Sequence, residues 1–537
     1  MNDTDTQKVK EHLPYLLSLL VLTLLPRLQF ATPYLFDGDP VNYYLGAKNL
    51  LEGNGYFAMG VPVIWPIGYS LTIIPLLLIF DGVAAASASS VIFSTLGVFM
   101  LYLIGVELFS KRIAFVSALL FGFSETYFFN SVNVASDSHA LFFTLTSIYF
   151  FIKFLDEHNS KWAVLSGLFI SYSVITRYQT AIFILLPFIY LYWESRNNRF
   201  PDFMNEKSKL RKNLLLFLLS LLPFAILQFY FNYSGYGSIL PSQYAAATSS
   251  GWENAFGVYI LNFFRILYRM AFSIDFYAPI GITLALTGAF VIKDKPGTLS
   301  LLAIWGFLGL LPMSIYLVVP RYFFIALAPF TLLMAVGAEY LFLKVGQLPF
   351  IANRSFNLRV VLTSVIILSL SASYLSKSFR LVSSNKNELS AMSAAFSWIK
   401  KNSHEDSAVI AQSIYYGHFS IWEAIGQSVW VGEYYSGRKV YSVTDDLQGI
   451  SKNHPELFLV VNDYWQNENN LLMMYSEKNR EGTNRIFKSY KTEMVQSFAT
   501  QRNFVLWKLS FGSNHPDYSY VNEHLFKIYK VTVDSLR

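Results

Sequence analysis

Three aspartates next to long apolar segments are the residues best suited to chemistry. Asp37 and Asp39 form an Asp-Gly-Asp triplet directly after the first apolar segment, and Asp137 follows Ser136 between two later ones. A carboxylate beside lipid is costly unless it has a partner or a task. A general base is one such task, and an Asp-x-Asp pair also suits a hard cation such as Mg²⁺ or Mn²⁺. The alternative is helix capping, by an aspartate before Pro40 and by Ser136 or Asp137, and both interpretations remain open.

Arginines occupy comparable positions, at the ends of apolar segments or in the loops between them. They are Arg27, Arg177, Arg265, Arg269 and Arg321. Such side chains snorkel to headgroup phosphates, or they form a cradle for one anionic lipid phosphate, for which arginine offers paired donors. For the cradle we favour Arg177 and Arg321, with Lys48 and Arg27 behind them.

The composition shows what must position these residues. Of the 537 residues, 53% are hydrophobic, 14% are charged and none is cysteine. Soluble proteins carry about 25% charged residues, so most of this chain is not a soluble globule. The absence of cysteine excludes thiol catalysis, thiolate metal sites and disulfides. The net charge of +6 comes without blocks of interleaved basic and aromatic residues, so nucleic acid is not an expected partner.

Long apolar runs predict a polytopic α-helical membrane protein. A spanning helix needs about 20 mostly apolar residues. We expect about eleven transmembrane helices, at 13–32, 86–109, 113–131, 139–155, 162–176, 178–193, 214–233, 279–293, 298–319, 322–343 and 360–377. The run 65–80 is shorter, and we expect it to lie along the outer surface or to dip in and return. The polar start before the first span shows no cleavage site, which predicts a retained anchor.

The distribution of Lys and Arg predicts the orientation, because basic loops favour the cytoplasmic side. With the N-terminus inside and 65–80 not crossing, the basic loops all fall on that side. These loops contain Lys111 and Arg112, Lys153 and Lys161, the cluster Arg196 to Lys212, Lys293 and Lys295, and Lys344 to Arg359. The odd number of spans then places the C-terminus outside, in a multi-pass protein of the cell membrane.

A change in composition near residue 378 predicts two domains. Residues 1–377 would form the membrane domain, and residues 378–537, rich in Lys, Glu, Asp, Asn and Ser, an extracytoplasmic soluble α/β domain. Within the second domain we expect a helix and short apolar strands. The helix is Glu388–Lys401, and the strands are Ala408–Gln412, Leu457–Val461 and Phe504–Leu509.

The predicted outer face combines the acids, the arginines, the soluble domain and an amphipathic stretch from Asn42 to Glu52, which suits an interfacial helix. This combination fits chemistry on a phosphorylated lipid. A transporter is the weaker interpretation, because its ionisable residues lie near the bilayer midplane and its halves repeat, whereas the mid-span positions here are almost wholly apolar.

The loop from Phe36 to Tyr69 resembles the first outer loop of GT-C fold glycosyltransferases. Its segments are Phe36-Asp-Gly-Asp-Pro-Val-Asn-Tyr-Tyr, the helix that ends at Gly53-Asn-Gly55, and Trp65-Pro-Ile-Gly-Tyr69. Among these enzymes it resembles glycosyltransferase family 39, the group of the protein O-mannosyltransferases and the lipid A aminoarabinose transferase. Further matches are Ser136-Asp137, Ile175-Thr-Arg177, Arg321-Tyr322 with Ala326-Leu-Ala-Pro329, Trp398-Ile-Lys-Lys-Asn402 and Tyr434-Tyr-Ser-Gly-Arg438.

The resemblance implies an inverting transferase that uses a polyprenyl-phosphate-linked sugar as donor and a hydroxyl of a protein, lipid or glycan as acceptor. Asp39 matches the family's catalytic Asp. The family's usual next residue, Glu, is Pro40 here, so Asp37 is a candidate to share the role. Tyr43 and Tyr69 become candidate substrate-binding residues of the loop. A divalent metal stays an open possibility, because several relatives work without one.

In the expected mechanism, Asp39 takes the proton of the acceptor hydroxyl, the arginines stabilise the leaving phosphate, and Asp137 orients the base or the sugar. Two other functions remain in view. The chain could be a transporter or flippase for lipid-linked glycans, or a non-catalytic membrane subunit.

Overall fold

The computed structural model describes residues 3–35, 38–80, 82–197, 207–240, 280–315, 324–346, 389–412, 431–462, 473–499 and 525–533, with a few isolated positions between them. The chain divides into two compact units. The first comprises Met1–Ala31 and Gly46–Ser378, and the second comprises Thr32–Leu45 and Phe379–Arg537. The predicted domains differ from these units in the segment 32–45, which the prediction placed with the membrane domain.

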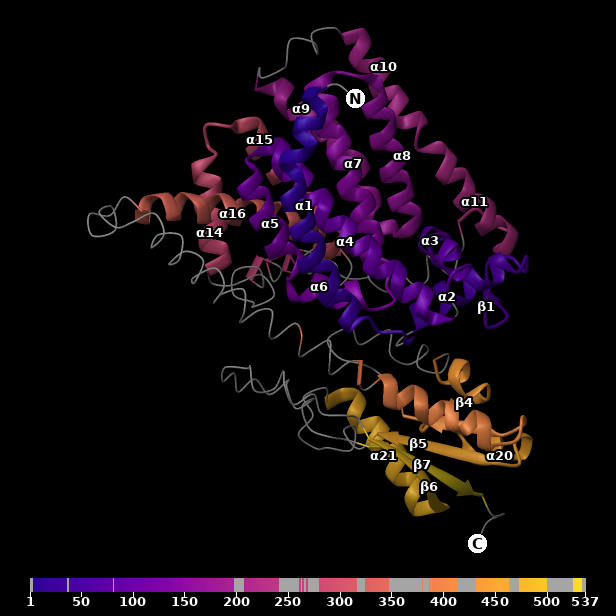
Figure 1. The fold of residues 1–537 in the computed structure, drawn as a ribbon. Helices are drawn as coiled ribbons and strands as arrows, with labels where there is room; N and C mark the ends of the chain where they lie inside the picture. Colours follow the sequence, from indigo (N-terminus) through magenta and orange to yellow (C-terminus); the bar gives the residue numbers. More distant parts are fainter. Residues whose placement is uncertain are drawn as a thin grey trace. The chain divides into compact units, whose positions relative to one another are not determined.

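The first unit is helical (Figure 1). Its helices, in chain order, are α1 (Asp3–Phe30), α2 (Gly38–Leu51, whose first residues belong to the second unit), α3 (Gly68–Leu77), α4 (Val83–Leu108), α5 (Lys111–Gly122), α6 (Glu125–Val132), α7 (Asp137–Glu157), α8 (Ser160–Thr176), the 3-10 helix η1 (Tyr178–Leu185), α9 (Leu186–Arg196), α10 (Lys207–Leu219), α11 (Leu222–Tyr236), α14 (Ile280–Val291), α15 (Pro296–Ile315) and α16 (Phe324–Gly346).

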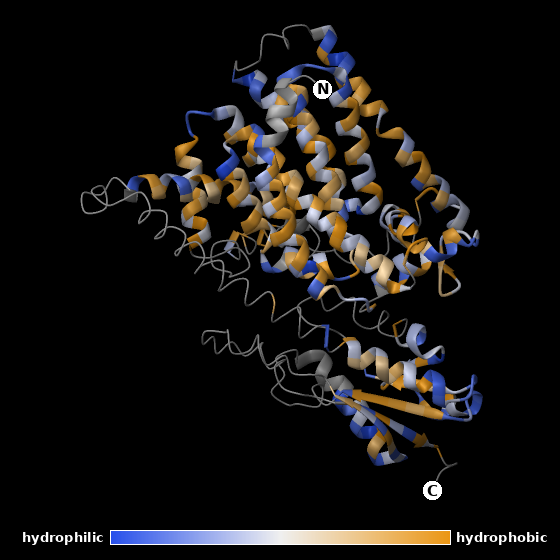
Figure 2. Cartoon of the chain, viewed as in Figure 1, coloured by the Kyte–Doolittle hydropathy of each residue, from blue (hydrophilic) through white to orange (hydrophobic). Residues whose placement is uncertain are grey.

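Within the described part of the chain, five helical segments are long and apolar enough to cross a membrane. They are Glu11–Phe30, Val83–Leu108, Asp137–Glu157, Ser208–Tyr236 and Ile325–Lys344. Hydrophobic residues cover most of the length of these helices in Figure 2. The predicted polytopic membrane architecture is confirmed, whereas the total of about eleven spans stays a prediction, and the span 360–377 lies outside the described residues.

Two predicted spans are less regular in the structure than expected. The span 113–131 is divided into α5 and α6 at Phe123 and Ser124, where the Ser124 hydroxyl donates to the Phe121 carbonyl at 2.8 Å. The span 178–193 begins as the 3-10 helix η1 and becomes α-helical only at Leu186.

The short run 65–80 contains the ten-residue helix α3. At 1.5 Å per residue α3 covers about 15 Å, half of a hydrocarbon core, in agreement with a segment that does not cross.

The loop after α2 forms a small hairpin that sequence patterns did not predict. Strands β1 (Phe57–Ala58) and β2 (Val61–Pro62) pair antiparallel around Met59 and Gly60. Both turn residues have positive φ, 50° and 80°, as a tight two-residue hairpin turn requires.

The described part of the second unit contains a five-stranded mixed sheet in the order β4-β3-β5-β7-β6. The strands are β3 (Ala408–Ala411), β4 (Lys439–Ser442), β5 (Leu457–Asn462), β6 (Lys491–Ala499) and β7 (Leu525–Thr532). Strands β4, β3 and β5 are parallel, β7 runs antiparallel to β5, and β6 runs antiparallel to β7. The helices α20 (Leu447–Asn453), α21 (Met473–Ser489) and a helix over 389–402 accompany the sheet.

The core of the second unit confirms a soluble α/β domain. Every residue of β3 and β5 is buried, and Ile410, Leu459, Val443 and Ile486 form its centre. Two of the three predicted strands are confirmed as β3 and β5, while Phe504–Leu509 lies outside the described residues. Strands β4, β6 and β7 were missed because their residues alternate with charged and polar side chains instead of forming apolar runs.

Candidate active site

The ends of α7 and α8 bring one predicted acid and one predicted base together. The two helices form an antiparallel hairpin whose turn contains His158 in the left-handed conformation. Asp137, the first residue of α7, therefore lies beside Arg177, the residue after α8, and their carboxylate and guanidinium are 3.0 Å apart. The side chains are only 2% and 10% exposed, so this is a buried ion pair.

Local structure favours this pair on both sides. A carboxylate at a helix N-terminus and a cation at a helix C-terminus each complement the helix dipole. The chain turns at Arg177, which is extended, with φ of −158° and ψ of 112°, and its N–H donates to the Ser173 carbonyl. Nη1 of Arg177 also donates to the Ser136 hydroxyl at 3.3 Å. Ser136 occupies the N-cap position of α7, but its side chain makes no capping hydrogen bond. Its hydroxyl accepts the hydrogen bond from Arg177 instead.

Tyr69 and His139 form a second buried group, and His139 follows Asp137 in the first turn of α7. The Tyr69 hydroxyl lies 3.1 Å from the hydroxyl of Ser90 on α4, and its ring stands edge-on to His139 at 4.5 Å. Nε2 of His139 is 2.7 Å from the Ser89 hydroxyl. Both side chains are fully buried, so Tyr69 and His139 join α3, α4 and α7.

The Trp-Pro-Ile-Gly-Tyr motif seats α3 against α8. A Cβ added to Gly68 would lie 2.6 Å from the hydroxyl of Thr176 and 2.7 Å from the carbonyl of Ile175, the residues just before Arg177. The hydroxyl of Tyr172 donates to the Gly68 carbonyl at 3.1 Å. Only glycine permits this approach, so the motif fixes the end of α8 and, through it, the position of the arginine.

The polar residues of α11 were missed as members of this region. Gln228 accepts a hydrogen bond from the N–H of Ile67 at 3.0 Å and donates to Asn232 at 2.8 Å. The polar amide of Gln228 inside the apolar run 214–233 was the sequence feature that could have indicated such a contact. Asn232 also donates to the Ile239 carbonyl at 2.8 Å and is 6% exposed, so its side-chain amide is buried and hydrogen-bonded.

Arg27 lies wholly inside the first unit. Its guanidinium donates to the Ser94 hydroxyl at 3.1 Å and to the carbonyls of Thr23 at 2.9 Å and Gly122 at 2.7 Å. Its carbon Cζ also lies over the rings of Tyr127 and Phe128. These contacts tie α1 to α4, α5 and α6, and they favour a structural role over the predicted phosphate contact.

The remaining predicted residues are distributed over both units. Asp39 stands in the first turn of α2 and, with the buried Tyr43, belongs to the second unit. Lys48, in the last turn of α2, belongs to the first unit; its side chain is 52% exposed and lies 3.8 Å from Glu52. Asp37 and Arg321 lie outside the described residues, as do Arg265 and Arg269. No group of three potential metal ligands occurs among the residues that the structure describes.

Comparison with known proteins identifies the fold. Residues 66–226, which contain Tyr69, Asp137 and Arg177, match the sequence model of a family described as dolichyl-phosphate-mannose-protein mannosyltransferase. No curated protein sequence matches the chain at a significant level.

Solved structures match over most of the chain. One is the oligosaccharyltransferase of Archaeoglobus fulgidus tethered with an acceptor peptide containing the NVT sequon, with 14% identity, a TM-score of 0.57, and coverage of 90% of this chain and 73% of that one. Another is ArnT from Cupriavidus metallidurans in the apo state, with 12% identity, a TM-score of 0.55, and coverage of 84% and 93%. A third is the same enzyme bound to undecaprenyl phosphate, with 11% identity, a TM-score of 0.53, and coverage of 96% and 98%.

The fold is therefore that of a polytopic GT-C membrane protein with a C-terminal soluble domain. The predicted resemblance to GT-C glycosyltransferases is confirmed, and the segment from α3 to α11 carries the mannosyltransferase sequence match.

Proposed function

We propose that this protein is an inverting glycosyltransferase that moves a sugar from a polyprenyl-phosphate carrier to an acceptor hydroxyl on the outer face of the membrane. The observation that carries the proposal is the buried Asp137–Arg177 pair, because it lies within the segment that matches the mannosyltransferase family. Two matching proteins bind a lipid phosphate in their solved structures: the Archaeoglobus fulgidus oligosaccharyltransferase is in complex with a dolichol-phosphate, and ArnT is bound to undecaprenyl phosphate.

In the proposed reaction the acceptor oxygen attacks the anomeric carbon of the sugar. The bond from that carbon to the lipid phosphate oxygen breaks, and the phosphate leaves with the electron pair. Asp39 takes the proton of the acceptor hydroxyl, which makes the oxygen a better nucleophile. Because one displacement occurs at carbon, the anomeric configuration inverts. Asp37 remains a candidate partner of Asp39 in this role.

Arg177 is the proposed principal phosphate ligand, with Arg321 and Lys48 as further cations. A guanidinium has five N–H donors in a fixed plane, so it can bond more than one acceptor at once. Asp137 holds the guanidinium in one orientation before the substrate arrives, and a preorganised donor loses less free energy when negative charge develops on the leaving phosphate. Arg27 is assigned to structural support of α1, since its described bonds are internal.

The test uses the purified full-length protein with a polyprenyl-phosphate hexose labelled in the sugar. We expect sugar release and transfer in the wild type, and a loss of about 10²-fold or more in Asp39→Asn, the size expected when a general base is removed. The matched control is Asp294→Asn, which changes an exposed aspartate between α14 and α15. Undiminished turnover in Asp39→Asn would refute the catalytic assignment.

Three additional measurements test the stereochemistry, the transporter alternative and the requirement for a metal. NMR of the product shows whether the anomeric configuration has inverted, and retention would refute single displacement. In sealed vesicles, movement of the lipid-linked sugar across the bilayer without transfer would support a transporter or flippase. Chelation with EDTA tests the requirement for a divalent metal. If the aspartates bind a required metal, EDTA abolishes turnover, and added Mg²⁺ or Mn²⁺ restores it.

A further inference from the structure

The segment that carries Asp39 packs with C-terminal residues inside the second unit. The backbone N–H of Leu35 donates to the hydroxyl of Tyr435 at 2.8 Å, and the Tyr34 hydroxyl donates to that of Ser390 at 3.2 Å. On the other side of Asp39, the ring of Tyr44 stands edge-on to that of Tyr434, with 5.9 Å between centroids. Two neighbouring tyrosines therefore contact the chain before and after the proposed base.

The contact is well packed on both sides. Leu35 is fully buried and Tyr44 is 6% exposed. The rings of Tyr434 and Tyr435 meet edge-to-face with 4.9 Å between centroids, an arrangement that aromatic pairs prefer. Burial raises the pKa of both phenols above the usual range, so both hydroxyls stay protonated and uncharged.

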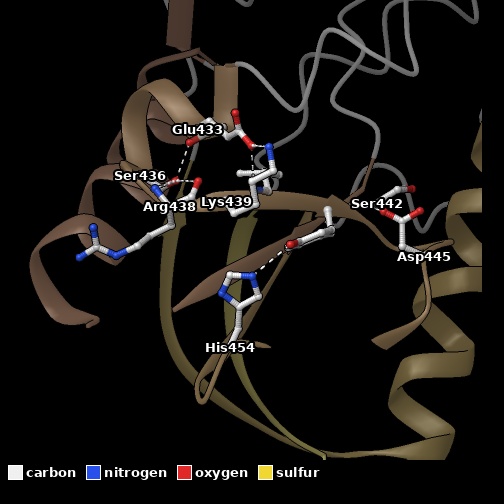
Figure 3. Close-up of polar contacts among 10 residues, drawn as sticks. Glu433, Ser436, Arg438, Lys439, Ser442, Asp445 and His454 are labelled. Atoms are coloured by element: carbon white, nitrogen blue, oxygen red, sulfur yellow. Dashed lines mark hydrogen bonds and ion pairs between the residues drawn. The ribbon is translucent and has the colours of Figure 1, made fainter. Parts of the chain in front are cut away.

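The residues that follow the tyrosines anchor them to the second unit. The Ser436 hydroxyl donates to the Gly432 carbonyl at 2.7 Å and accepts from the N–H of Arg438 at 3.1 Å, while Gly437 takes the left-handed conformation with φ of 60°. The helical turn over 431–436 therefore ends sharply, in the manner of a glycine C-cap. Figure 3 shows Ser436 and Arg438 at this turn.

Charged side chains join the turn to its neighbours. Arg438 donates to the carbonyls of Ser403 at 2.8 Å and Lys400 at 3.3 Å, at the end of the helix over 389–402. Glu433 pairs with Lys439 of β4 at 2.9 Å and accepts from the N–H of Val440 at 3.3 Å (Figure 3). The motif Tyr434-Tyr-Ser-Gly-Arg438 thus forms a well-anchored turn between the helical segment 431–436 and the edge strand β4.

We propose that Tyr435 and Tyr434 are positioning residues, through which the C-terminal domain sets the position of Asp39. The inference rests on the proposed role of Asp39 as the base. The Leu35–Tyr435 hydrogen bond fixes the chain before α2, and the Tyr44–Tyr434 contact fixes the rotation of α2 about its axis. Asp39 lies between these two fixed points in the chain, so the start of α2, which carries it, is restrained on both sides.

This arrangement predicts a defined kinetic effect. A base displaced by about 1 Å loses on the order of 10²-fold in rate, whereas donor binding by other residues is unaffected. We expect Tyr435→Phe, which removes the hydroxyl and keeps the ring, to lower kcat by roughly tenfold while the donor KM changes less than about twofold. Tyr434→Ala should lower kcat more than Tyr434→Phe, because phenylalanine keeps the ring contact with Tyr44.

The matched control is Tyr441→Phe. Tyr441 lies on β4 in the same unit, and its hydroxyl bonds Nε2 of His454 at 3.0 Å, away from the segment 32–45. If Tyr441→Phe lowers kcat as much as Tyr435→Phe does, the effect is a general one of domain stability and the inference is overturned. Wild-type kcat in both Tyr435→Phe and Tyr434→Ala overturns it as well.

A second measurement reports the contact without using activity. Because the chain has no cysteine, the pair Tyr34→Cys with Ser390→Cys can be joined by a short bismaleimide in the full-length protein. We expect efficient cross-linking of this pair, preserved kcat in the cross-linked protein, and little cross-linking of the control pair Tyr34→Cys with Ser442→Cys. Equal cross-linking of both pairs, or none of the first, contradicts the contact. If Asp39→Asn proves active, the proposed function fails, while this cross-link still tests the contact.

Discussion

The ion pair of Asp137 with Arg177 is the residue-scale feature that most constrains this protein. Transfer of two charges out of water costs several kcal/mol for each ion, and their attraction offsets this only with good geometry and further hydrogen bonds. Here the 3.0 Å contact, the Ser136 hydroxyl and the two helix dipoles supply those terms. Because both side chains are largely buried, at 10% and 2% exposure, each depends on the other.

Removal of one partner should therefore cost more than removal of both. We expect Asp137→Asn to destabilise the protein by about 3–5 kcal/mol, because it leaves a buried guanidinium without its counter-charge. In the double variant with Arg177→Met the loss should be smaller, although transfer activity is abolished in both. Thermal unfolding of the purified protein in one detergent measures this, with Asp294→Asn as the control. Additive losses in the double variant would show that the two side chains do not interact.

At the scale of elements, close backbone contact depends on glycine. Helices α14 and α16 cross at Gly288 and Gly337, where an added Cβ would lie 2.0 Å from the carbonyl oxygens of Leu333 and Leu284 respectively. Small residues at a crossing let two helices approach within van der Waals contact of their backbones, which is the main source of attraction between helices in lipid. The same principle applies to Gly68 between α3 and α8.

Gly337→Ala should separate these helices, because the obstructing atoms are backbone and cannot rotate away. We expect a fall in the melting temperature and increased proteolysis near α14. Gly306→Ala in α15 is the matched control: its Cβ would meet only Pro329, at 3.8 Å, and alanine is favoured over glycine in a helix by roughly 0.5–1 kcal/mol. Equal destabilisation by the two substitutions would contradict the crossing.

The strands of the second unit are joined at one end by Glu456. Its carboxylate accepts from Lys530 of β7 at 2.6 Å and from Ser407, next to β3, at 2.9 Å. Burial raises the pKa of Glu456, but the hydrogen bonds and the charge of Lys530 outweigh burial, and the net pKa is lowered. A lowered pKa gives stability that is present above the unfolded value of about 4.3 and is lost as the pH falls through the folded value.

Glu456→Gln should remove this acid-side dependence. Because Lys530 is half exposed, we expect an effect of no more than about 1 kcal/mol at pH 7, which is lost as the pH falls through the folded pKa of Glu456. Hydrogen exchange of β5 amides in the full-length protein, corrected for intrinsic rates, measures it. Glu405→Gln, at an exposed position before β3, serves as control. A pH profile for Glu456→Gln that parallels the wild type would show that another group is responsible.

Local patterns predicted the elements whose evidence lies in a single stretch of chain. The apolar runs located α1, α4 and α7, and the amphipathic stretch from Asn42 to Glu52 located most of α2, although the helix begins earlier, at Gly38, and so includes Asp39. Contacts between distant segments were not predictable in this way. Arg27 and Arg177 look alike in sequence, each at a helix end, yet one bonds carbonyls inside the bundle and the other an aspartate 40 residues before it.

At the scale of the whole molecule, the division into units could not be predicted from composition. The shift near residue 378 is visible in the sequence, but the segment 32–45 joins the second unit through a hydrogen bond to the Leu35 backbone and the ring contact of Tyr44. Nearly every residue has the same backbone N–H donor, and the sequence does not distinguish a buried tyrosine from an exposed one, so neither contact could be predicted. Only the folded chain shows that the loop after α1 and the C-terminal residues form one unit.

The orientation of the first unit is the last prediction, because the proposed transfer takes place on the outer face. The chain lacks cysteine, so single cysteines report sidedness without background. Asn54, in the turn after α2, and Asn197, after α9, are both exposed. In sealed, right-side-out vesicles, a membrane-impermeant maleimide should label Asn54→Cys directly but Asn197→Cys only after permeabilisation, because the basic cluster after α9 favours the cytoplasmic side. The reverse pattern would place Asp137 and Arg177 on the cytoplasmic side and exclude transfer at the outer face.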